Sequence, residues 1–277
     1  MENISVSHVL WSGNRKFDYI KGVRKNMDKK IRKIAEKIVK AKKFIIFTGA
    51  GISTESGIPD YRSQGGIWDK FRPVYFDEFM SSKKQRIKYW QQKLDFNREL
   101  VKSRPNKGHL AIAKMNEMGF LHTLITQNID GLHQESGIQD EKIIELHGNT
   151  RRIRCMTCSR TIPFEEAEAM IAAGDSAPEC TCGGYLKPDT ISFGQAMPEY
   201  ETKKAVELSA SCDLFMVVGS TLVVQPASLM PDYAKQAGAF LVIINLSETP
   251  CDSSCDILIR EKAGNILERI AAENENL

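Results

Sequence analysis

Long hydrophobic runs are absent from this sequence of 277 residues. Its longest apolar stretches, at 44–47, 214–218 and 240–244, are far shorter than the roughly 18 residues that a membrane-spanning helix needs. The residues after Met1 also lack the apolar stretch of a signal peptide. These absences argue against membrane and secreted classes, and we expect a soluble, cytoplasmic protein that binds no membrane.

Cysteines are few and odd in number. Seven cysteines without a secretion signal argue against a framework of disulfides. Four of them form two close pairs, Cys155-x₂-Cys158 and Cys180-x-Cys182, and thiolates in such pairs suit a tetrahedral Zn²⁺ ion. Because four sulfur ligands leave no place for water, we predict a structural zinc site, with free thiols or a redox pair as alternatives. The other three cysteines lack this pairing, and we expect no second site from them.

The small net charge of +3 is unevenly distributed. Residues 1–43 hold 13 Lys and Arg against 4 Asp and Glu, a net of +9 that leaves −6 for the rest of the chain. A basic arm could contact nucleic acid or an acidic partner. A run of charged residues more often forms the solvent-exposed face of a helix, so we do not expect nucleic-acid binding. Residues 1–26 have no clear hydrophobic period and are predicted to be a basic N-terminal extension.

Apolar runs alternate with amphipathic segments through most of the chain. Helical spacing begins near Asp28, and short apolar runs predict the strands. Alternation of this kind predicts an α/β fold with a doubly wound, Rossmann-like parallel sheet that helices cover on both faces. We expect strands at about 44–47, 121–126, 142–146, 214–218 and 240–246, and helices at about 108–118, 229–236 and 265–272.

A glycine turn follows the first predicted strand. The run Gly-Ala-Gly-Ile-Ser at 49–53 allows backbone N–H groups to approach a phosphate. The third glycine of the dehydrogenase fingerprint would fall at position 54, which is Thr54. The turn therefore favours nucleotide binding but not hydride transfer, and taken alone it could be a plain tight turn.

Two further groups of polar residues follow predicted strands. Gln127, Asn128 and Asp130 come after the strand at 121–126, where ligands bind in open α/β sheets. The alternative is that Asn128 and Asp130 cap the next helix. His147 follows the strand at 142–146, and a loop histidine with a pKa near neutrality can act as a general base.

These motifs together resemble the sirtuin family. The resemblance lies in the runs at 49–63, 126–133 and 145–149, the cysteine cluster and the run at 218–226, and it covers about residues 30–270. It implies an NAD-dependent protein deacylase, a sirtuin-type transferase. In the implied reaction the acyl oxygen displaces nicotinamide from the ribose, and His147 then deprotonates a ribose hydroxyl. Water finally releases lysine and O-acyl-ADP-ribose.

The resemblance also assigns roles to individual residues. The implied catalytic residues are His147, Asn128 and Asp130. The implied NAD⁺ contacts are Gly49, Ala50, Gly51, Ser53, Asp60, Tyr61, Arg62, Gln127, Asn128, Ile129, Asp130, Gly219, Ser220, Thr221, Asn245, Leu246 and Ala263. The implied contacts to the acylated lysine of a protein or peptide are Ile191, Phe193, Gly194 and Val223. One structural Zn²⁺ per chain would be held by Cys155, Cys158, Cys180 and Cys182.

The same reading divides the chain into parts. After the extension at 1–26, residues 27–150 form the first part of the NAD-binding domain, with a helical insertion at about 69–107. Residues 151–187 form a small zinc-ribbon domain, and residues 188–277 complete the NAD-binding domain. Three other functions stay open: an ADP-ribosyltransferase, an NAD⁺ hydrolase, and a nucleotide-binding scaffold without catalysis.

The helical insertion bears on which acyl group is preferred. Sirtuins that prefer acidic acyl chains carry a Tyr-x-x-Arg pair there, whereas this chain offers Tyr89 with Gln92, or Trp90 with Lys93. Neither pair supplies the two-pronged guanidinium of arginine. We therefore predict a preference for acetyl or a longer apolar acyl group over succinyl.

Overall fold

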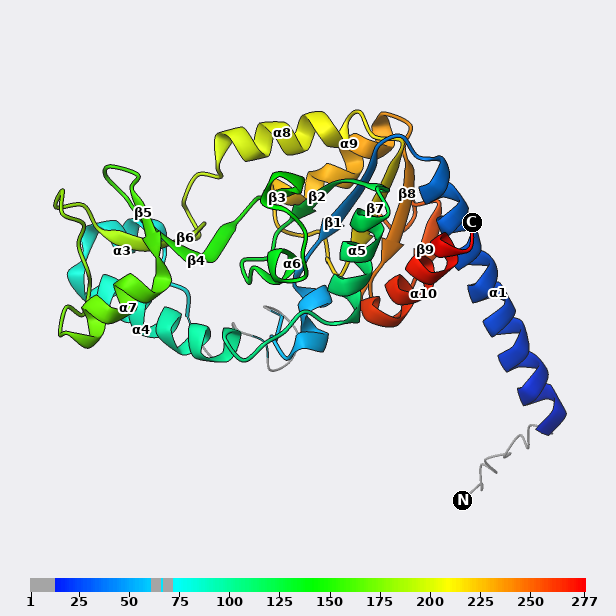
Figure 1. Cartoon of the computed structure of the whole chain (residues 1–277), viewed down its shortest axis with the longest axis horizontal. Helices are drawn as coiled ribbons and strands as arrows, with labels where there is room; N and C mark the ends of the chain where they lie inside the picture. The colour runs from blue at the N-terminus through cyan, green and yellow to red at the C-terminus, as the bar shows by residue number, and fades with distance from the viewer. Residues whose placement is uncertain (1–12, 61–65, 67–71) are drawn as a thin grey trace, which may run out of the picture.

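The computed structural model describes residues 13–60, 66 and 72–277, and it contains a large domain joined to a smaller module (Figure 1). The large domain is built on one six-stranded sheet in which every neighbouring pair of strands is parallel. The predicted doubly wound α/β fold is confirmed. The strands run in the order β3 (Ile143–Glu145), β2 (Leu121–Thr126), β1 (Phe44–Thr48), β7 (Leu214–Val218), β8 (Phe240–Ile244) and β9 (Ile257–Ile259).

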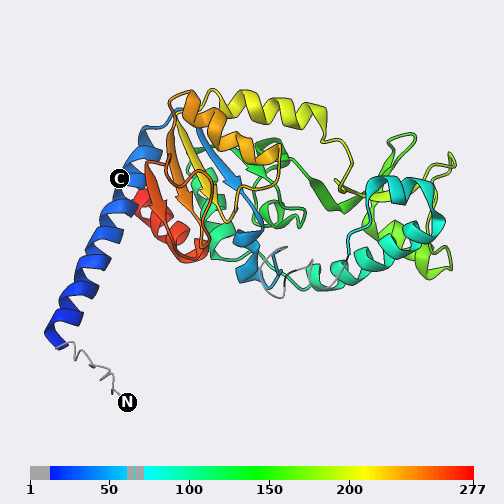
Figure 2. The same cartoon turned by 180° about the vertical axis from the view of Figure 1, so that it is seen from behind.

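Alternating side chains of the strands divide the core into two layers. In β1, Phe44 and Ile46 pack with α1, α5 and α10, whereas Ile45 and Phe47 pack with α8 and α9 on the other face. The two views of the molecule show these helices on opposite sides of the sheet (Figure 1, Figure 2). The covering helices are α1 (Gly13–Lys40), α5 (Lys107–Glu117), α8 (Glu199–Ser209), α9 (Met230–Gln236) and α10 (Ala263–Glu275).

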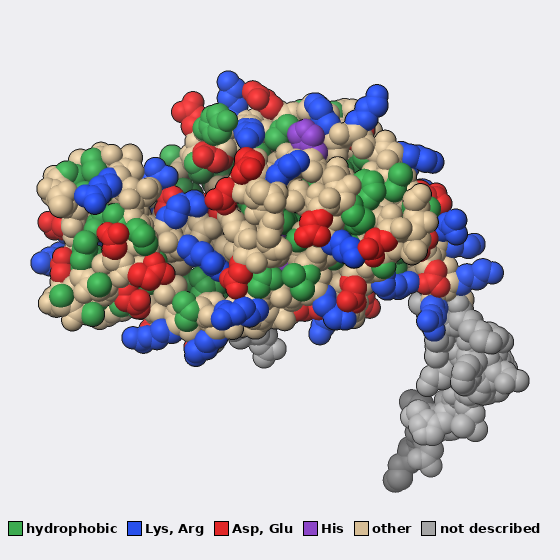
Figure 3. Space-filling view, viewed as in Figure 1, with side chains coloured by type: hydrophobic (Ala, Val, Ile, Leu, Met, Phe, Trp, Pro, Cys, Tyr) green, Lys and Arg blue, Asp and Glu red, His purple; other side chains and the backbone are tan. Residues whose placement is uncertain are grey.

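The first helix is longer than the sequence pattern predicts. Helix α1 begins at Gly13, well before Asp28, so residues 13–26 of the predicted extension are helical. Its C-terminal half buries Ile31, Ile34 and Ile38 in the core, while its N-terminal end projects from the large domain (Figure 1). Basic and acidic side chains mix over the face drawn in space-filling form, and basic ones gather near the described part of α1 (Figure 3).

The smaller module combines the helical insertion with the cysteine-rich segment. A three-stranded antiparallel sheet, in the order β5-β4-β6, packs with α4 and α7 around Trp90, Phe164 and Cys155. The predicted boundaries at 150 and 187 fall inside β4 and β6, so these two strands connect the parts. The elements are α3 (Phe76–Ser81), α4 (Lys83–Leu100), β4 (Gly148–Cys155), β5 (Thr161–Pro163), α7 (Phe164–Ala172) and β6 (Leu186–Thr190).

The order of the strands creates a crevice between β1 and β7. The chain fills the sheet outward from β1 through β2 to β3, and then outward from β7 through β8 to β9. Ligands of open α/β sheets bind outside the carboxyl ends of the strands at such a switch point. Short helices lie near this edge, namely η1 (Ala50–Ser56), α6 (Leu132–Glu135) and η3 (Ala227–Leu229), whereas η2 (Asp140–Lys142) leads into the opposite end of β3. Within the described residues, no helix has the length and apolar character to cross a membrane.

Candidate active site

A cavity of about 1170 Å³ lies at the carboxyl ends of the central strands and extends to α4 of the smaller module. Thirteen predicted NAD⁺ contacts line it: Gly49, Ala50, Gly51, Asp60, Gln127, Asn128, Ile129, Gly219, Ser220, Thr221, Asn245, Leu246 and Ala263. The four predicted acyl-lysine contacts, Ile191, Phe193, Gly194 and Val223, line the same cavity, as does His147. Tyr61 and Arg62 lie outside the described residues. The fold thus gathers both sets of residues around one space.

Two glycine turns meet at the switch point. The N–H of Gly51 donates to the carbonyl of Gly219 at 2.8 Å. Gly219 has a φ of +63°, and a Cβ there would lie 2.3 Å from the backbone nitrogen of Ile52. Position 219 therefore needs glycine for its conformation and for its space. The contact brings the backbones after β1 and β7 together without side chains between them, at the edge where a pyrophosphate would bind.

Amide side chains form the next part of the wall. The Nδ2 of Asn128 donates to the carbonyl of Gly49 and to Ser53 Oγ, each at 3.2 Å. The Nε2 of Gln127 donates to Ser220 Oγ at 2.8 Å. These bonds fix two polar groups at the cavity surface before any ligand binds. The alternative that Asn128 only caps the next helix is not what the structure shows.

Asp130 and Ser53 lie behind this wall, since neither is among the residues that line the cavity. The Asp130 carboxylate accepts from Ser53 Oγ at 2.7 Å and from the N–H of Leu132 at 2.9 Å, at the start of α6. Burial raises the pKa of Asp130, and these hydrogen bonds oppose the rise. The Asp130 carboxylate thus also contacts the start of α6, and its direct contact with NAD⁺ remains a prediction.

His147 occupies the turn between β3 and β4. Its Nδ1 lies 3.0 Å from the backbone carbonyl of Gln127. Because a carbonyl can only accept, Nδ1 carries the proton, and Nε2 of the neutral ring keeps its lone pair. Burial lowers the pKa of His147, although the bond to Gln127 opposes this. The imidazole is therefore neutral near pH 7 and able to accept a proton.

The other described histidines do not line the cavity. His109 and His133 are buried side by side, with ring centroids 4.9 Å apart. Asn106 N donates to His109 Nδ1, while His133 Nε2 is bonded to the hydroxyl of Thr48. Burial lowers the pKa of His109 to about 4. Both histidines are structural, which leaves His147 as the candidate base among the described histidines.

The segment after β6 forms the other side of the cavity. The N–H of Ile191 donates to the carbonyl of His147 at 2.9 Å, so this segment and the candidate base are directly joined. The carbonyl of Phe193 accepts from the N–H of Phe76 at the start of α3. Phe193 is 41% exposed and Val223 52% exposed, and both also line the cavity. Two accessible apolar side chains suit contact with an extended peptide.

The helix α4 presents one of the two predicted pairs to the cavity. Trp90 is buried in the smaller module, where its Nε1 donates to Leu186 O, so it does not line the cavity. Tyr89, Gln92 and Lys93 do line it. Burial alone would raise the pKa of Tyr89, but the positive charges of Lys93 and Lys187 lower it to about 7. Polar and charged groups therefore lie in this wall.

The four paired cysteines converge in the smaller module. Their Sγ atoms all lie within 4.8 Å of one another, with Cys155 and Cys182 3.6 Å apart and Cys158 and Cys180 3.8 Å apart. A tetrahedral ion with Zn–S bonds of about 2.3 Å needs sulfurs separated by roughly 3.8 Å. A Cβ on Gly184 would lie 2.7 Å from Cys155 Sγ, so glycine leaves the room that the sulfurs occupy. The donor set fits a closed zinc site.

Sequence reasoning missed several lining residues near the end of the chain. Ser247, Glu261 and Lys262 line the cavity beside the predicted Asn245 and Ala263. They follow β8 and β9, and the rule that ligands bind at the carboxyl ends of strands could have indicated them. The strand β9 has only three residues, Ile257–Ile259, which is too short for a clear hydrophobic pattern.

The chain matches the family model described as "Sir2 family" over residues 49–226. It is 46% identical to NAD-dependent protein deacetylase 1 of Bradyrhizobium diazoefficiens, over 86% of this chain and 93% of that protein. It is 39% identical to NAD-dependent protein deacylase 2 of Archaeoglobus fulgidus, over 91% and 98%.

Solved structures agree with the sequence comparisons. A structure from work on the mechanism and regulation of Sir2 enzymes matches with a TM-score of 0.78 and 38% identity, over 90% of this chain and 99% of that one. A complex of Sir2 with a p53 peptide and NAD⁺ also has a TM-score of 0.78, with 30% identity over 88% and 98%. The fold and site define a Rossmann-like enzyme with an inserted zinc-ribbon module. The chain belongs to the Sir2 family, the sirtuins.

Proposed function

We propose that this protein is an NAD-dependent protein lysine deacylase, with acetyl-lysine as its main substrate. The observation that carries the proposal is the position of His147, a neutral imidazole in the wall of a cavity that nucleotide-type turns and the segment 191–194 share. The relatives' names and the complex with peptide and NAD⁺ support the same substrates.

Each part of the cavity has a role in this proposal. NAD⁺ supplies the ADP-ribosyl group that receives the acyl group, water releases the lysine, and the products are nicotinamide, lysine and O-acyl-ADP-ribose. The turns around Gly51 and Gly219 hold the pyrophosphate, and Gln127 and Asn128 hold the nicotinamide and its ribose. His147 Nε2 accepts the proton of a ribose hydroxyl. Asp130 holds Ser53 and the start of α6 in place.

The peptide substrate binds beside the segment after β6 in the proposed complex. Ile191, Phe193 and Gly194 offer backbone groups and apolar surface on one side, and Val223 does so on the other. An extended peptide between them would add a strand, which is a common way to bind a chain irrespective of most of its side chains. The acyl-lysine would reach inward toward His147.

We also propose that Cys155, Cys158, Cys180 and Cys182 hold one structural Zn²⁺. The closeness of the four sulfurs supports this role. A closed set of four thiolates leaves no open position for water, so the ion stabilises the module and takes no part in the chemistry.

The proposal is tested by identifying the products. The purified protein is incubated with NAD⁺ and an acetyl-lysine peptide, and all products are identified by mass spectrometry. Deacylation gives unmodified peptide and O-acetyl-ADP-ribose in equal amounts. Peptide carrying ADP-ribose would instead identify a transferase, and free ADP-ribose with intact acetyl-peptide would identify an NAD⁺ hydrolase. Either outcome would overturn the proposal, as would a protein that consumes no NAD⁺.

A further inference from the structure

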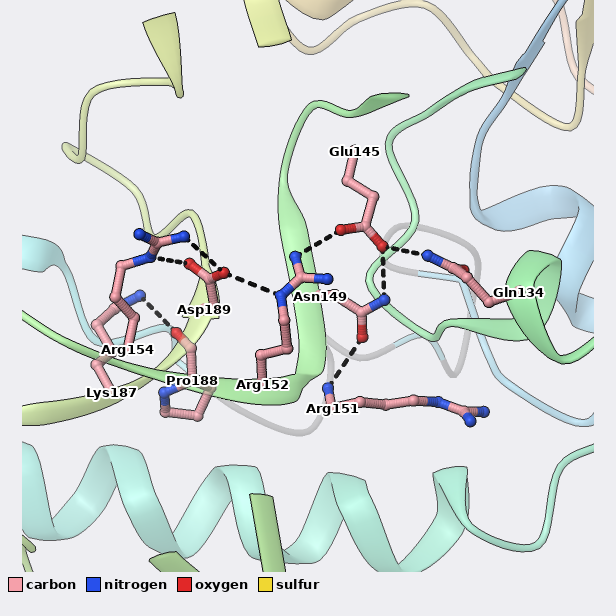
Figure 4. A network of polar contacts seen from close by, with 9 residues as sticks. All are labelled: Gln134, Glu145, Asn149, Arg151, Arg152, Arg154, Lys187, Pro188 and Asp189. Atoms are coloured by element: carbon pink, nitrogen blue, oxygen red, sulfur yellow. Dashed lines mark hydrogen bonds and ion pairs between the residues drawn. The ribbon is translucent and has the colours of Figure 1, made fainter. Parts of the chain in front are cut away.

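Three side chains outside the cavity connect its catalytic edge to its substrate edge. Arg152 Nη2 donates to Glu145 Oε2 at 2.6 Å, and Arg152 Nε donates to Asp189 Oδ2 at 3.2 Å (Figure 4). Glu145 ends β3 of the large sheet, whereas Asp189 lies in β6 of the smaller sheet. We name this arrangement the Glu145–Arg152–Asp189 bridge. Its three members do not line the cavity.

Both carboxylates of the bridge are well shielded and fully engaged. The side chains of Glu145 and Asp189 are each 13% exposed. Glu145 Oε1 also accepts from Gln134 at 2.7 Å and from Asn149 at 2.6 Å. The bonds to arginine outweigh burial and lower the pKa of Asp189. Charged hydrogen bonds in such surroundings are stronger and more directional than those on an open surface.

An irregularity in strand pairing places Arg152 at the junction. Asn149 pairs with Asp189, but the next pair is Ile153 with Pro188, so residues 150–152 of β4 have no partners in β6. Such bulges bend a strand and redirect its side chains. Here the extra residues bring the guanidinium of Arg152 between the two carboxylates, as the close view shows (Figure 4).

The bridge joins the backbone segment that carries the candidate base to the segment that carries the predicted acyl-lysine contacts. Glu145 is two residues before His147, and Asp189 is two residues before Ile191. Between them the N–H of Ile191 donates to the carbonyl of His147 at 2.9 Å. A Cβ on Gly148 would lie only 1.9 Å from the carbonyl oxygen of Asp189, so the two backbones are in close contact. A shift of β6 against β3 would move the substrate segment relative to the base.

We propose that Arg152 is a positioning residue, which keeps the acyl-lysine segment in register with His147 through the Glu145–Arg152–Asp189 bridge. This inference rests on the proposed function. Arg152 touches neither substrate, and it acts through the two carboxylates. Its effect should therefore appear in the binding and turnover of the acyl-peptide and not in the affinity for NAD⁺, whose turns follow β1 and β7.

Arg154 provides a matched control. It makes a two-pronged pair with the same Asp189 carboxylate, at 2.7 and 3.1 Å, and its side chain is 42% exposed against 43% for Arg152. No bond joins it to Glu145 in the described part of the chain, so it does not cross between the sheets. Loss of Arg154 removes a similar ion pair without removing the bridge.

The experiment compares Arg152→Met, Arg152→Lys, Arg154→Met and Glu145→Gln with the wild type. We expect Arg152→Met to raise KM for an acetyl-peptide and lower kcat, reducing kcat/KM by about tenfold or more, because a displacement of about 1 Å can cost roughly a hundredfold. KM for NAD⁺ should stay within about twofold, because no member of the bridge lines the cavity and separate sites act independently. Arg154→Met should stay within about threefold of wild type, because it removes an ion pair within the smaller sheet and leaves the bridge to Glu145 in place. Arg152→Lys keeps the charge without the fork, so it should recover only part of the loss.

A purely structural role for Arg152 would give a different pattern. Partial unfolding lowers kcat by reducing the active fraction and leaves both KM values unchanged, and thermal melting measures that fraction. Glu145→Gln keeps an acceptor for Gln134 and Asn149 but removes the charge, so it tests the bridge if Arg152→Met does not fold. Equal KM values for the acetyl-peptide in Arg152→Met, Glu145→Gln and Arg154→Met would overturn this inference alone. A wild-type protein that removes no acetyl group would overturn the proposed function and this inference with it.

Discussion

Gly148 is the residue whose replacement should most clearly couple stability to activity. It follows the candidate base, its φ is +73°, and an added Cβ would lie 1.9 Å from Asp189 O. The left-handed conformation alone costs a non-glycine residue roughly 1–2 kcal/mol. The contact with a backbone oxygen cannot be relieved by a side-chain rotation, so in Gly148→Ala the strands β4 and β6 must separate near His147.

Gly119 is the matched control because its φ is +80° and a Cβ there meets nothing within 4 Å. Gly119→Ala should lower the free energy of unfolding by roughly 1–2 kcal/mol, a fall in Tm of a few degrees, and leave kcat/KM unchanged. Gly148→Ala should lose more stability, and its kcat/KM on an acetyl-peptide should fall by about a hundredfold because the base moves by about 1 Å. Thermal melting and steady-state kinetics measure the two effects. If Gly148→Ala matched Gly119→Ala in both, the described contact between His147's turn and β6 would be refuted.

Three further predictions concern the metal, the buried histidines and the acyl group. Elemental analysis should find one zinc per chain. Cys155→Ser should lose the ion and much of the stability, because the binding energy of a structural zinc is folding energy, whereas the control Cys255→Ser should keep both. A stable, active, zinc-free protein would contradict this. Burial lowers the pKa of His109 to about 4 and that of His133 well below 6.5, so these rings stay neutral when folded and take up protons on unfolding. Their contribution to stability is complete above about pH 6.5 and falls by up to about 1.4 kcal/mol per pH unit per ring below it. When Tm is measured from pH 8 to pH 5, it should depend less on pH in His109→Gln than in the wild type. An unchanged dependence of Tm on pH would argue against the buried pair as its cause. On one peptide, kcat/KM should be higher for acetyl than for succinyl, because a buried carboxylate without a full partner costs several kcal/mol. Lys93→Met should remove acetyl groups at a rate within a few-fold of the wild type. A succinyl preference that depends on Lys93 would contradict the prediction.

The strands of the large sheet were predictable because they are buried on both faces. Continuous apolar runs at 44–47, 214–218 and 240–244 coincide with β1, β7 and β8 to within a residue. The start of α1 was not predictable in this way. Residues 13–26 carry no clear hydrophobic period, and the prediction therefore began at Asp28, where Ile31 and Ile34 enter the core.

The composition of the site was predictable in part, for a physical reason. Turns that follow strands are local features of the sequence, so Gly49, Asn128 and His147 could be recognised as cavity residues. Long-range contacts leave no local signal: Arg152 and Asp189 are 37 positions apart, and their pairing depends on how β4 and β6 meet. The depth of Asp130 behind the wall was likewise invisible, because a capping and a ligand-binding aspartate look the same in sequence.

The central claim is that His147 is the general base of an NAD-dependent deacylation, and His147→Ala tests it most directly. With NAD⁺ and an acetyl-lysine peptide, followed by mass spectrometry, the variant should form O-acetyl-ADP-ribose about 10²–10⁴ times more slowly than the wild type. Its Tm and zinc content should be unchanged, because the imidazole lies at the cavity wall and, among the described residues, bonds only to Gln127 O. A folded His147→Ala protein that forms O-acetyl-ADP-ribose at a rate within a few-fold of the wild type would contradict the account.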